Sequence, residues 1–247
     1  MALGCKRSMQ YLELTLPSIA ENLALDEALL DEAQTSDARI ETLRIWQAHS
    51  PFVVLGRSSR VADEVQQHST TELSVPVFRR VSGGATVVAG PGCMFYALVL
   101  SLEQRPQLRM LDVAHRFVMG RLQSALQSLV PQLEFNGTCD LVVARRKVSG
   151  NSVRLVRDWM LYHGTLLLDM DLALADRLLK HPPREPEYRG GRSHADFLAN
   201  IQLPYSTVAA ALRSHWQADL QYDPLPLGRI ESLARDKYSK ESWNLAR

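Results

Sequence analysis

Short strand-like apolar runs come in groups along this chain, and helical segments separate the groups rather than follow every strand. Residues 43–46 and 52–56, for example, are two such runs joined through a His49-Ser50-Pro51 turn, an arrangement that predicts a hairpin. Strict alternation of strands and helices would indicate a doubly wound parallel sheet. The grouped order instead predicts an α+β domain with a mixed, largely antiparallel sheet flanked by helices.

Local patterns predict where the helices begin. Ser18 and Glu21 have the spacing of a capping box, in which each side chain binds the other residue's backbone N–H. Across residues 107–129 apolar side chains recur at three-to-five spacing, which predicts a long amphipathic helix. The other predicted elements are strands at 10–16, 75–80, 94–100 and 159–168, a helix capped by Asp171 that ends at 179, a rigid linker at 182–186 and a helix at 207–216.

The bulk composition excludes several classes of protein. With 247 residues the chain can form one large domain, and we predict a single domain over 1–247, with a core at about 10–200 and a helical tail at about 201–247. A net charge of +1 gives no reason to expect a nucleic-acid or membrane partner. Three cysteines without CxxC spacing argue against a zinc site or disulfide framework. The longest apolar run, residues 93–100, is too short to span a bilayer, and charges interrupt the N-terminal segment where a signal peptide would be apolar. These features predict a cytoplasmic protein.

A basic cluster runs into a stretch of small residues, RRKVSGNS, at positions 145–152. A lysine where a strand ends at a glycine-containing turn can point its ammonium group at an anion, and the backbone N–H groups of the turn add further donors. Lys147 is therefore a candidate anion ligand, although a solvated basic hairpin loop would have the same composition.

A second glycine-rich stretch, RRVSGGA at positions 79–85, follows another predicted strand. Adjacent glycines let the backbone approach a ligand closely, but they also suit a plain hairpin turn. The flanking Arg79, Arg80 and Ser82 favour a binding loop. Arg57, which follows Gly56 at a strand end, is another candidate anion ligand or else a surface arginine.

The common catalytic motifs are absent from the sequence, namely GxxxxGK[ST], GxGxxG, HExxH and GxSxG. The seven histidines do not have metal-ligand spacing. If this protein uses ATP, lysine, arginine and backbone donors must hold the phosphates.

Seven segments in order give a specific resemblance: NLALDE at 22–27, LRIW at 43–46, VVLGR at 53–57, RRVSGG at 79–84, DLVV at 140–143, RKVSG at 146–150 and HGTLL at 163–167. In this series the chain resembles lipoate–protein ligases of the biotin/lipoate ligase and octanoyltransferase superfamily, over roughly residues 10–200. The resemblance implies a fold like the catalytic core of class II aminoacyl-tRNA synthetases and biotin ligases.

The resemblance also implies an activity. The enzyme would activate lipoate with ATP to lipoyl-AMP and pass the lipoyl group to a lysine of a lipoyl carrier domain, of the 2-oxoacid dehydrogenase E2 or glycine cleavage H protein type. Lys147 matches the lysine that contacts the acyl carboxyl group and the adenylate phosphate, and Asp140 matches an acidic residue near the adenylate and Mg²⁺. Apolar strand residues would form the slot for an eight-carbon chain. The residues expected to bind lipoate or the acyl-adenylate are Arg57, Arg79, Arg80, Ser82, Gly83, Gly84, Ala85, Gly150, Asn151, Ser152, His163, Gly164 and Thr165.

The sequence also departs from the family pattern. The glycine triplet of the family reads Gly83-Gly84-Ala85 here, and residues 89–93 (AGPGC) replace a segment with a His-Asp pair. The chain stops about where the accessory domain of the ligases would begin. Either a separate accessory subunit is needed, or the reaction does not start from free lipoate and ATP.

Two alternatives therefore stay open behind the ligase. The first is an octanoyl- or lipoyltransferase that uses Cys139 as a thioester nucleophile without ATP, although the charge of the adjacent Asp140 would raise the thiol pKa. The second is a non-catalytic lipoate-binding homologue. For either enzyme we expect an acidic lipoyl domain to meet the basic loop of Arg184, Arg189 and Arg192.

Overall fold

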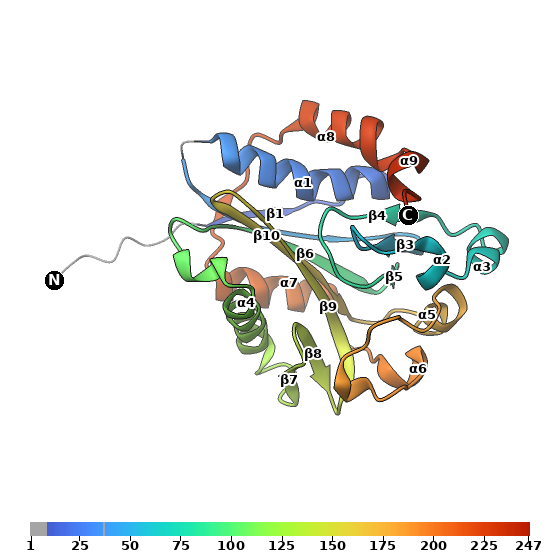
Figure 1. The fold of residues 1–247 in the computed structure, drawn as a ribbon. Helices are drawn as coiled ribbons and strands as arrows, with labels where there is room; N and C mark the ends of the chain where they lie inside the picture. Colours follow the sequence, from blue (N-terminus) through green and yellow to red (C-terminus); the bar gives the residue numbers. More distant parts are fainter. Residues whose placement is uncertain (1–8, 37) are drawn as a thin grey trace.

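The structure is a computed structural model that describes residues 9–36 and 38–247. Cys5 and the N-terminal segment considered above for a signal peptide lie outside the described residues. An eight-stranded sheet with the order β11-β1-β2-β6-β10-β9-β8-β7 forms the centre, and a three-stranded sheet, β4-β3-β5, lies beside it (Figure 1). The strands are β1 (Met9–Glu13), β2 (Glu41–Gln47), β3 (Phe52–Leu55), β4 (Val77–Arg79), β5 (Val87–Ala89), β6 (Cys93–Ser101), β7 (Leu133–Asn136), β8 (Asp140–Val143), β9 (Arg146–Val156), β10 (Trp159–Leu167) and β11 (Leu220–Gln221).

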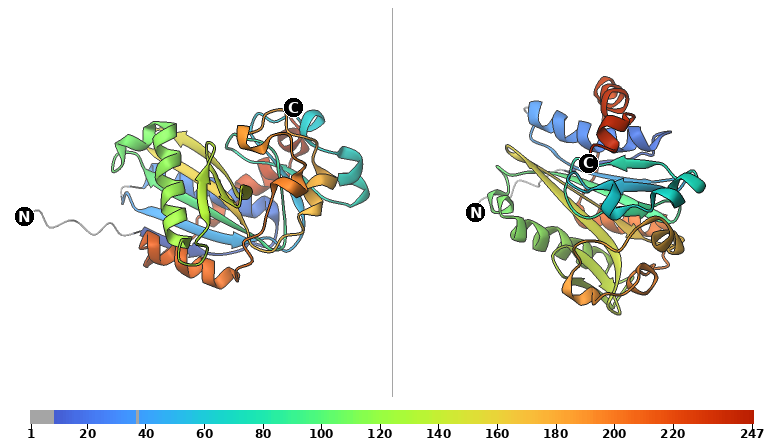
Figure 2. Two further views of the ribbon diagram at one scale, coloured as in Figure 1. Left: turned by 90° about the horizontal axis from the view of Figure 1, so that it is seen from below. Right: turned by 45° about the vertical axis from the view of Figure 1, so that its right-hand side comes forward.

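Helices cover both faces of the large sheet. One face packs against α1 (Ile19–Thr35) and α8 (Leu227–Leu233), and the other against α4 (Leu111–Leu126) and α7 (Tyr205–Trp216) (Figures 1 and 2). Strand β6 shows why, because alternate side chains point to opposite faces. Tyr96 and Leu98 belong to different faces from their neighbours Ala97 and Val99, and all four are buried. The shorter helical segments are α2 (Val61–Glu64), α3 (Gln67–Glu72), η1 (Pro106–Arg109), α5 (Ala173–Leu178), η2 (Glu187–Arg189), α6 (His194–Phe197), η3 (Ala234–Tyr238) and α9 (Glu241–Asn244).

The predicted fold class is confirmed. Strand β1 pairs in parallel with β2 and β11, whereas every other neighbouring pair of the large sheet is antiparallel. The capping box is also present, since the Ser18 side chain accepts from the Glu21 N–H and the Glu21 carboxylate accepts from the Ser18 N–H. The long helix predicted over 107–129 is shorter than expected: α4 spans Leu111–Leu126, the separate 3-10 helix η1 precedes it, and residues 127–129 form a turn.

Two local predictions are wrong. Residues 43–46 and 52–56 do not form a hairpin, because β2 lies in the large sheet between β1 and β6, and β3 lies in the small sheet between β4 and β5. Both strands are almost wholly buried because each is central in its sheet, with both edges already paired. The turn between them leads the chain from one sheet to the other.

The predicted turn after Lys147 is the second error. Residues 146–156 form the single strand β9, and the turn lies before it, at Ala144 and Arg145, both of which have positive φ. Gly150 thus lies inside a strand. A Cβ atom there would stand 3.5 Å from Cε of Lys147, an ordinary van der Waals contact, so the lysine side chain lies directly beside Gly150.

The tail beyond residue 200 packs back on the rest of the domain. It is not wholly helical, because β11 extends the large sheet beside β1. Its last helix, α9, lies against β4, and the backbone carbonyl of Arg247 accepts from the N–H of Val61 (Figure 1). In the part of the chain that the structure describes, no helix is long and apolar enough to cross a bilayer.

Candidate active site

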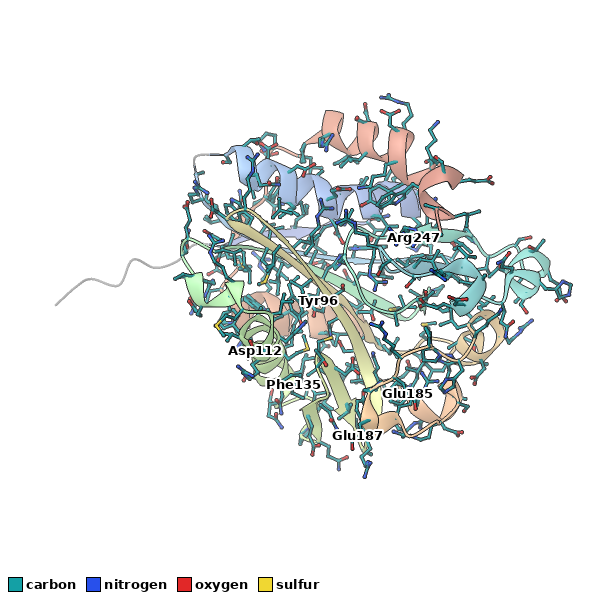
Figure 3. The ribbon with its side chains drawn as sticks, viewed as in Figure 1. Tyr96, Asp112, Phe135, Glu185, Glu187 and Arg247 are labelled. Atoms are coloured by element: carbon teal, nitrogen blue, oxygen red, sulfur yellow. The ribbon has the colours of Figure 1, made fainter. Side chains whose placement is uncertain are left out.

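A cavity of about 200 Å³ lies where the two sheets meet. Three parts of the chain form its wall: the facing strands β9 and β10, the small sheet with the loop between β4 and β5, and the segment from Pro182 to Leu198. Figure 3 shows Tyr96, which also lines the cavity, near the middle of the large sheet, and Glu185 on the segment that includes α6. Of the residues predicted for the site, the cavity is lined by Arg80, Ala85, Lys147, Gly150, Asn151, Ser152, His163, Gly164 and Thr165.

The cavity wall is partly apolar. Trp46 and Phe95 stack with ring centroids 3.9 Å apart, and Val54 and Leu167 add aliphatic surface. The wall also carries cationic side chains. Among the described lining residues four are lysine or arginine (Arg80, Lys147, Arg184 and Arg189), and Asp26 is the one carboxylate. The cavity therefore suits a molecule with an apolar chain and an anionic head.

The two adjacent arginines of the glycine-rich stretch do different things. Arg79 is 1% exposed and does not line the cavity; its guanidinium group donates to the carbonyls of Gly56 (2.8 Å), Ser59 (2.8 Å) and Trp243 (3.1 Å). Arg80 does line the cavity, where burial lowers its pKa to about 10. Its Nη2 donates to the carbonyls of Gly83 and Ala85, which fold the loop around the guanidinium group.

Close approach requires a glycine at position 56, backbone conformation favours one at position 84, and neither constraint applies to Gly83. A Cβ atom on Gly56 would stand 1.9 Å from the carbonyl oxygen of Gly84, and Gly84 itself has a φ of +86°. A Cβ atom on Gly83 would meet nothing within 4 Å. The carbonyl of Gly83 accepts from the Ser152 hydroxyl at 2.7 Å, which joins the loop to β9.

A buried polar chain crosses from this loop to α1. Ser82 Oγ lies against His163 Nε2, His163 Nδ1 lies 3.2 Å from Asp26 Oδ2, and Arg44 donates to the other oxygen of Asp26. Asn22 completes the chain by accepting from Arg44 Nη2 at 2.6 Å. Burial alone would raise the pKa of Asp26, but Arg44 and His163 outweigh it and the pKa lies below its usual value. Sequence reasoning found Ser82 and His163 but assigned no role to Asn22, Asp26 or Arg44, although they lie in the NLALDE and LRIW segments.

Gly164 on strand β10 leaves room for the Asn151 side chain of the neighbouring strand β9. A Cβ atom on Gly164 would stand 1.9 Å from Oδ1 of Asn151, so only glycine lets the amide lie across the strand. The Asn151 amide donates to the Cys139 carbonyl (2.7 Å) and to Ser149 Oγ (2.9 Å), and accepts from the Tyr96 hydroxyl. The amide is thereby fixed in the cavity wall.

Lys147 lines the cavity, with its ammonium group 2.7 Å from Oδ1 of Asp140. The other oxygen of Asp140 accepts from the Tyr188 hydroxyl at 2.8 Å. Asp140 itself is 6% exposed and does not line the cavity. It therefore lies behind the lysine.

Among the described residues, Asp140 does not belong to a cluster of protein side chains that could hold a metal ion by themselves. Mg²⁺ is usually bound through one or two carboxylates together with substrate phosphates, and both Asp140 oxygens are already engaged. Across residues 9–36 and 38–247, no group of three or more His, Cys, Asp or Glu side chains could hold a metal ion. The assignment of Mg²⁺ to Asp140 stays a prediction, and the geometry gives it no support.

Three further predicted residues lie away from the cavity wall or differ in exposure. Arg57 is exposed and does not line the cavity. Cys139 also lies outside the wall, and burial together with the charge of Asp140 raises the pKa of its thiol to about 11. Arg189, expected on a basic surface loop, is instead 4% exposed and lines the cavity, because Phe197 packs against its guanidinium group at 4.8 Å. That surface prediction is wrong for Arg189.

Comparison with known proteins agrees with this geometry. Residues 18–211 match the family model "Lipoyl protein ligase A/B catalytic domain". A curated relative, lipoate–protein ligase 1 of Staphylococcus aureus, is 26% identical over 239 residues, which cover 92% of this chain and 70% of the relative. Octanoyltransferase LipM of Geobacillus kaustophilus is 24% identical over 265 residues, covering 92% of this chain and 94% of the relative.

Solved structures share the fold. A lipoate–protein ligase A bound with ATP matches with a TM-score of 0.77 and 22% identity over 96% of this chain and 98% of the other. A bipartite lipoate–protein ligase and its E2 lipoyl domain from Thermoplasma acidophilum match with a TM-score of 0.76 and 21% identity, over 96% of each chain. Protein Ta0514 of T. acidophilum, with bound lipoic acid, matches with a TM-score of 0.76 and 20% identity over 97% of this chain and 99% of the other.

Proposed function

Because this chain belongs to the family of lipoyl protein ligase A/B catalytic domains, we propose that it activates lipoate with ATP and transfers the lipoyl group to a protein lysine. The intermediate is lipoyl-AMP, and the acceptor is a lysine of a lipoyl carrier domain. The relatives named lipoate–protein ligase, and the neighbouring structures with ATP and with lipoic acid, support this choice of substrates.

The observation that carries the proposal is that one cavity is lined by both apolar and cationic side chains. Its apolar surface, with Trp46 and Phe95, suits an aliphatic chain, for which each buried methylene contributes about 0.8 kcal/mol. Its cationic groups, Arg80 and Lys147, suit a carboxylate and then an acyl-phosphate. Lipoate has both parts in one molecule, and in this cavity its carboxylate would lie next to Lys147.

The reaction then follows in two balanced steps. A carboxylate oxygen of lipoate attacks the α-phosphorus of ATP, so that the acyl–phosphate bond forms while the bond to pyrophosphate breaks. Negative charge builds on the phosphate oxygens, and the Lys147 and Arg80 cations stabilise it because they are already in place. In the second step the neutral amine of the carrier lysine attacks the acyl carbon, AMP leaves, and the amine loses a proton as the amide forms.

The acceptor and the accessory component are part of the same proposal. The bipartite ligase of T. acidophilum with its E2 lipoyl domain supports a lipoyl domain of that type as the acceptor, and it supports a separate accessory subunit as a possible requirement. A glycine cleavage H protein is a second acceptor to test. The use of ATP supports the predicted cytoplasmic location.

A second function is favoured by one relative. LipM is named an octanoyltransferase, and an octanoyl- or lipoyltransferase would need a cysteine nucleophile. Cys139 is the candidate, but it is half-buried, its thiol has a pKa of about 11, and it lies outside the cavity wall. The ligase is therefore first, the transferase second, and a non-catalytic lipoate-binding protein third.

One experiment separates the three. Purified protein is offered an apo lipoyl domain with either lipoate and Mg-ATP or an octanoyl-carrier thioester, and wild type, Lys147→Ala and Cys139→Ala are compared. Transfer that needs ATP, is lost in Lys147→Ala and persists in Cys139→Ala is the expected result. Transfer from the thioester without ATP, abolished by Cys139→Ala, would make the protein a transferase. Lipoate binding without transfer from either donor, also with an accessory subunit added, would make it a binder.

A further inference from the structure

Lys147 is held at both its side chain and its backbone. The ammonium group lies 2.7 Å from Asp140 Oδ1, and the aliphatic part of the side chain lies over Gly150. The carbonyl of Lys147 accepts from the N–H of Ala199 at 2.9 Å, and Lys147 forms an isolated parallel bridge with Leu198. One end of the 185–199 segment thus fixes the backbone of the lysine.

The other end of the same segment fixes its carboxylate partner. The Tyr188 hydroxyl donates to Asp140 Oδ2 at 2.8 Å, and the Asp140 carboxylate therefore has one oxygen on each partner. A carboxylate that is 6% exposed loses most of its hydration, and two strong partners are needed to compensate for that loss. Tyr188 can donate throughout the neutral range because burial, followed by the charge of Asp140, raises its pKa well above the usual value.

Tyr188 is itself locked in position. Its ring packs on Phe197 with centroids 5.3 Å apart, and the guanidinium group of Arg192 lies 5.3 Å from the same Phe197 ring. Gly137 is also close, since a Cβ atom there would stand 3.2 Å from the tyrosine ring. The 185–199 segment therefore sets the position of Tyr188, and Tyr188 donates the second hydrogen bond to Asp140 when this segment lies against β8 and β9.

We propose that Asp140 and Tyr188 are positioning residues for Lys147. Asp140 fixes the direction of the Lys147 ammonium group, and Tyr188 fixes the position of the Asp140 carboxylate. The orientation of the lysine side chain therefore depends on how the 185–199 segment packs. Neither residue lines the cavity, so both act through Lys147. This assigns Asp140 to the lysine and not to a metal ion. The effect on turnover rests on the proposed function, because only a ligase would use Lys147 on an acyl-phosphate.

The test compares Tyr188→Phe, Asp140→Asn and the double variant with a matched control, Tyr11→Phe. Like Tyr188, Tyr11 donates to a carboxylate (Glu13, at 2.6 Å) and does not line the cavity, but its carboxylate partner is not Asp140. We expect Tyr188→Phe to lower kcat for lipoyl transfer about tenfold, the loss of one hydrogen bond to a charged group, with a smaller change in KM for lipoate. Asp140→Asn should lower kcat further. The double variant should be no worse than Asp140→Asn, because Tyr188 acts only through Asp140.

A second readout does not depend on turnover. The ligand-free proteins are treated with an N-hydroxysuccinimide ester, and the rate of acylation at Lys147 is followed by mass spectrometry, with Lys180 as the internal reference. An ammonium group must leave its carboxylate before it is acylated, so Lys147 should react faster in Tyr188→Phe and Asp140→Asn than in wild type or Tyr11→Phe.

The outcomes separate the two proposals. If wild type transfers lipoyl groups but Tyr188→Phe matches Tyr11→Phe in kcat and in Lys147 acylation, the positioning role is overturned. Additive losses in the double variant would overturn it as well. If wild type transfers nothing, the ligase proposal fails, and the acylation rates alone decide the positioning role. Should Asp140→Asn not fold, Tyr188→Phe decides by itself, because it removes one hydroxyl group and keeps the ring.

Discussion

Ser82 Oγ lies 2.5 Å from His163 Nε2, and this contact ties the glycine-rich loop of the small sheet to the central strand β10 of the large one. Asp26 on α1 lies against the other ring nitrogen, at 3.2 Å. The order Ser-His-Asp is that of a hydrolytic triad, but Ser82 is 1% exposed and does not line the cavity, so it is not placed to attack a substrate. The hydrogen bonds of Ser82, His163 and Asp26 instead fix the glycine-rich loop, in which the residues after Ser82 fold around Arg80.

His163→Ala should weaken both stability and substrate binding. The change removes the contacts to Ser82 and Asp26 and leaves their buried groups unpaired, which costs about 1–3 kcal/mol in the free energy of unfolding. With the loop loosened, KM for lipoate should rise. Urea unfolding and steady-state kinetics measure the two effects, with the exposed His49→Ala as control. Equal stability and KM in both variants would show that the contact to Ser82 does not hold the loop.

Asp26→Asn should lower stability in a pH-dependent way. The substitution leaves Arg44 buried without its carboxylate, at a cost of about 3 kcal/mol near neutral pH. Because the pKa of folded Asp26 is lowered, its contribution is present above the ordinary carboxyl pKa of 3.8 and is lost as the pH falls through the lower folded pKa. The deficit of Asp26→Asn relative to wild type should therefore shrink below about pH 4. Urea unfolding between pH 3 and 7 measures it, and a deficit that stays constant with pH would contradict the lowered pKa. The exposed Asp112→Asn is the control, and it should change stability little.

Two glycine-to-alanine changes should have opposite effects. In Gly164→Ala the new methyl group would stand 1.9 Å from Asn151 Oδ1 and 2.7 Å from the Gly150 carbonyl oxygen, so the Asn151 amide must move. We expect a loss of about 1–3 kcal/mol in the free energy of unfolding together with weaker lipoate binding. Gly120→Ala in α4 meets nothing within 4 Å and should gain about 0.5–1 kcal/mol. Calorimetric melting of both variants provides the comparison, and unchanged stability in Gly164→Ala would mean that β9 and β10 tolerate the displaced amide.

Cys139 should react as a thiol with a raised pKa. With a pKa of about 11, raised by burial and then by Asp140, little thiolate is present near pH 8, and the rate of alkylation by iodoacetamide should climb until about pH 11. Peptide mass spectrometry in a Cys5→Ser background follows Cys139 and the more deeply buried Cys93 separately. Rapid alkylation of Cys139 at pH 7 would reveal an activated thiol and favour the transferase.

Local features of the fold were predictable from the sequence, whereas strand partners were not. The Ser18–Glu21 capping box depends on residues three positions apart, and it was found. The partners of β2 and β3 depend on strands far along the chain, and an apolar run between turns has the same pattern in a hairpin as at the centre of two different sheets. The hairpin prediction failed for that reason.

The candidate site shows the same division. Arg79 and Arg80 are equivalent in a list of basic residues, but neighbours on an extended chain point to opposite sides, so only one faces the cavity. The sequence does not say which. Asp26 contacts His163 across 137 positions, and Tyr188 contacts Asp140 from a segment predicted as a linker and loop. Such polar pairs become visible only once the sheet brings the segments together.

The contacts of Arg79 with α9 also set the order in which a newly made chain can complete this site. The backbone N–H of Arg79 donates to Asn244 and its side chain to the Trp243 carbonyl, across separations of 165 and 164 residues. At typical rates of translation the ribosome needs roughly 8–33 seconds to make that intervening stretch. Until then the guanidinium group that braces the Gly56–Ser59 turn lacks its C-terminal partner. The glycine-rich loop at 79–85 is synthesised early, yet it is among the last parts of the molecule that can finish folding.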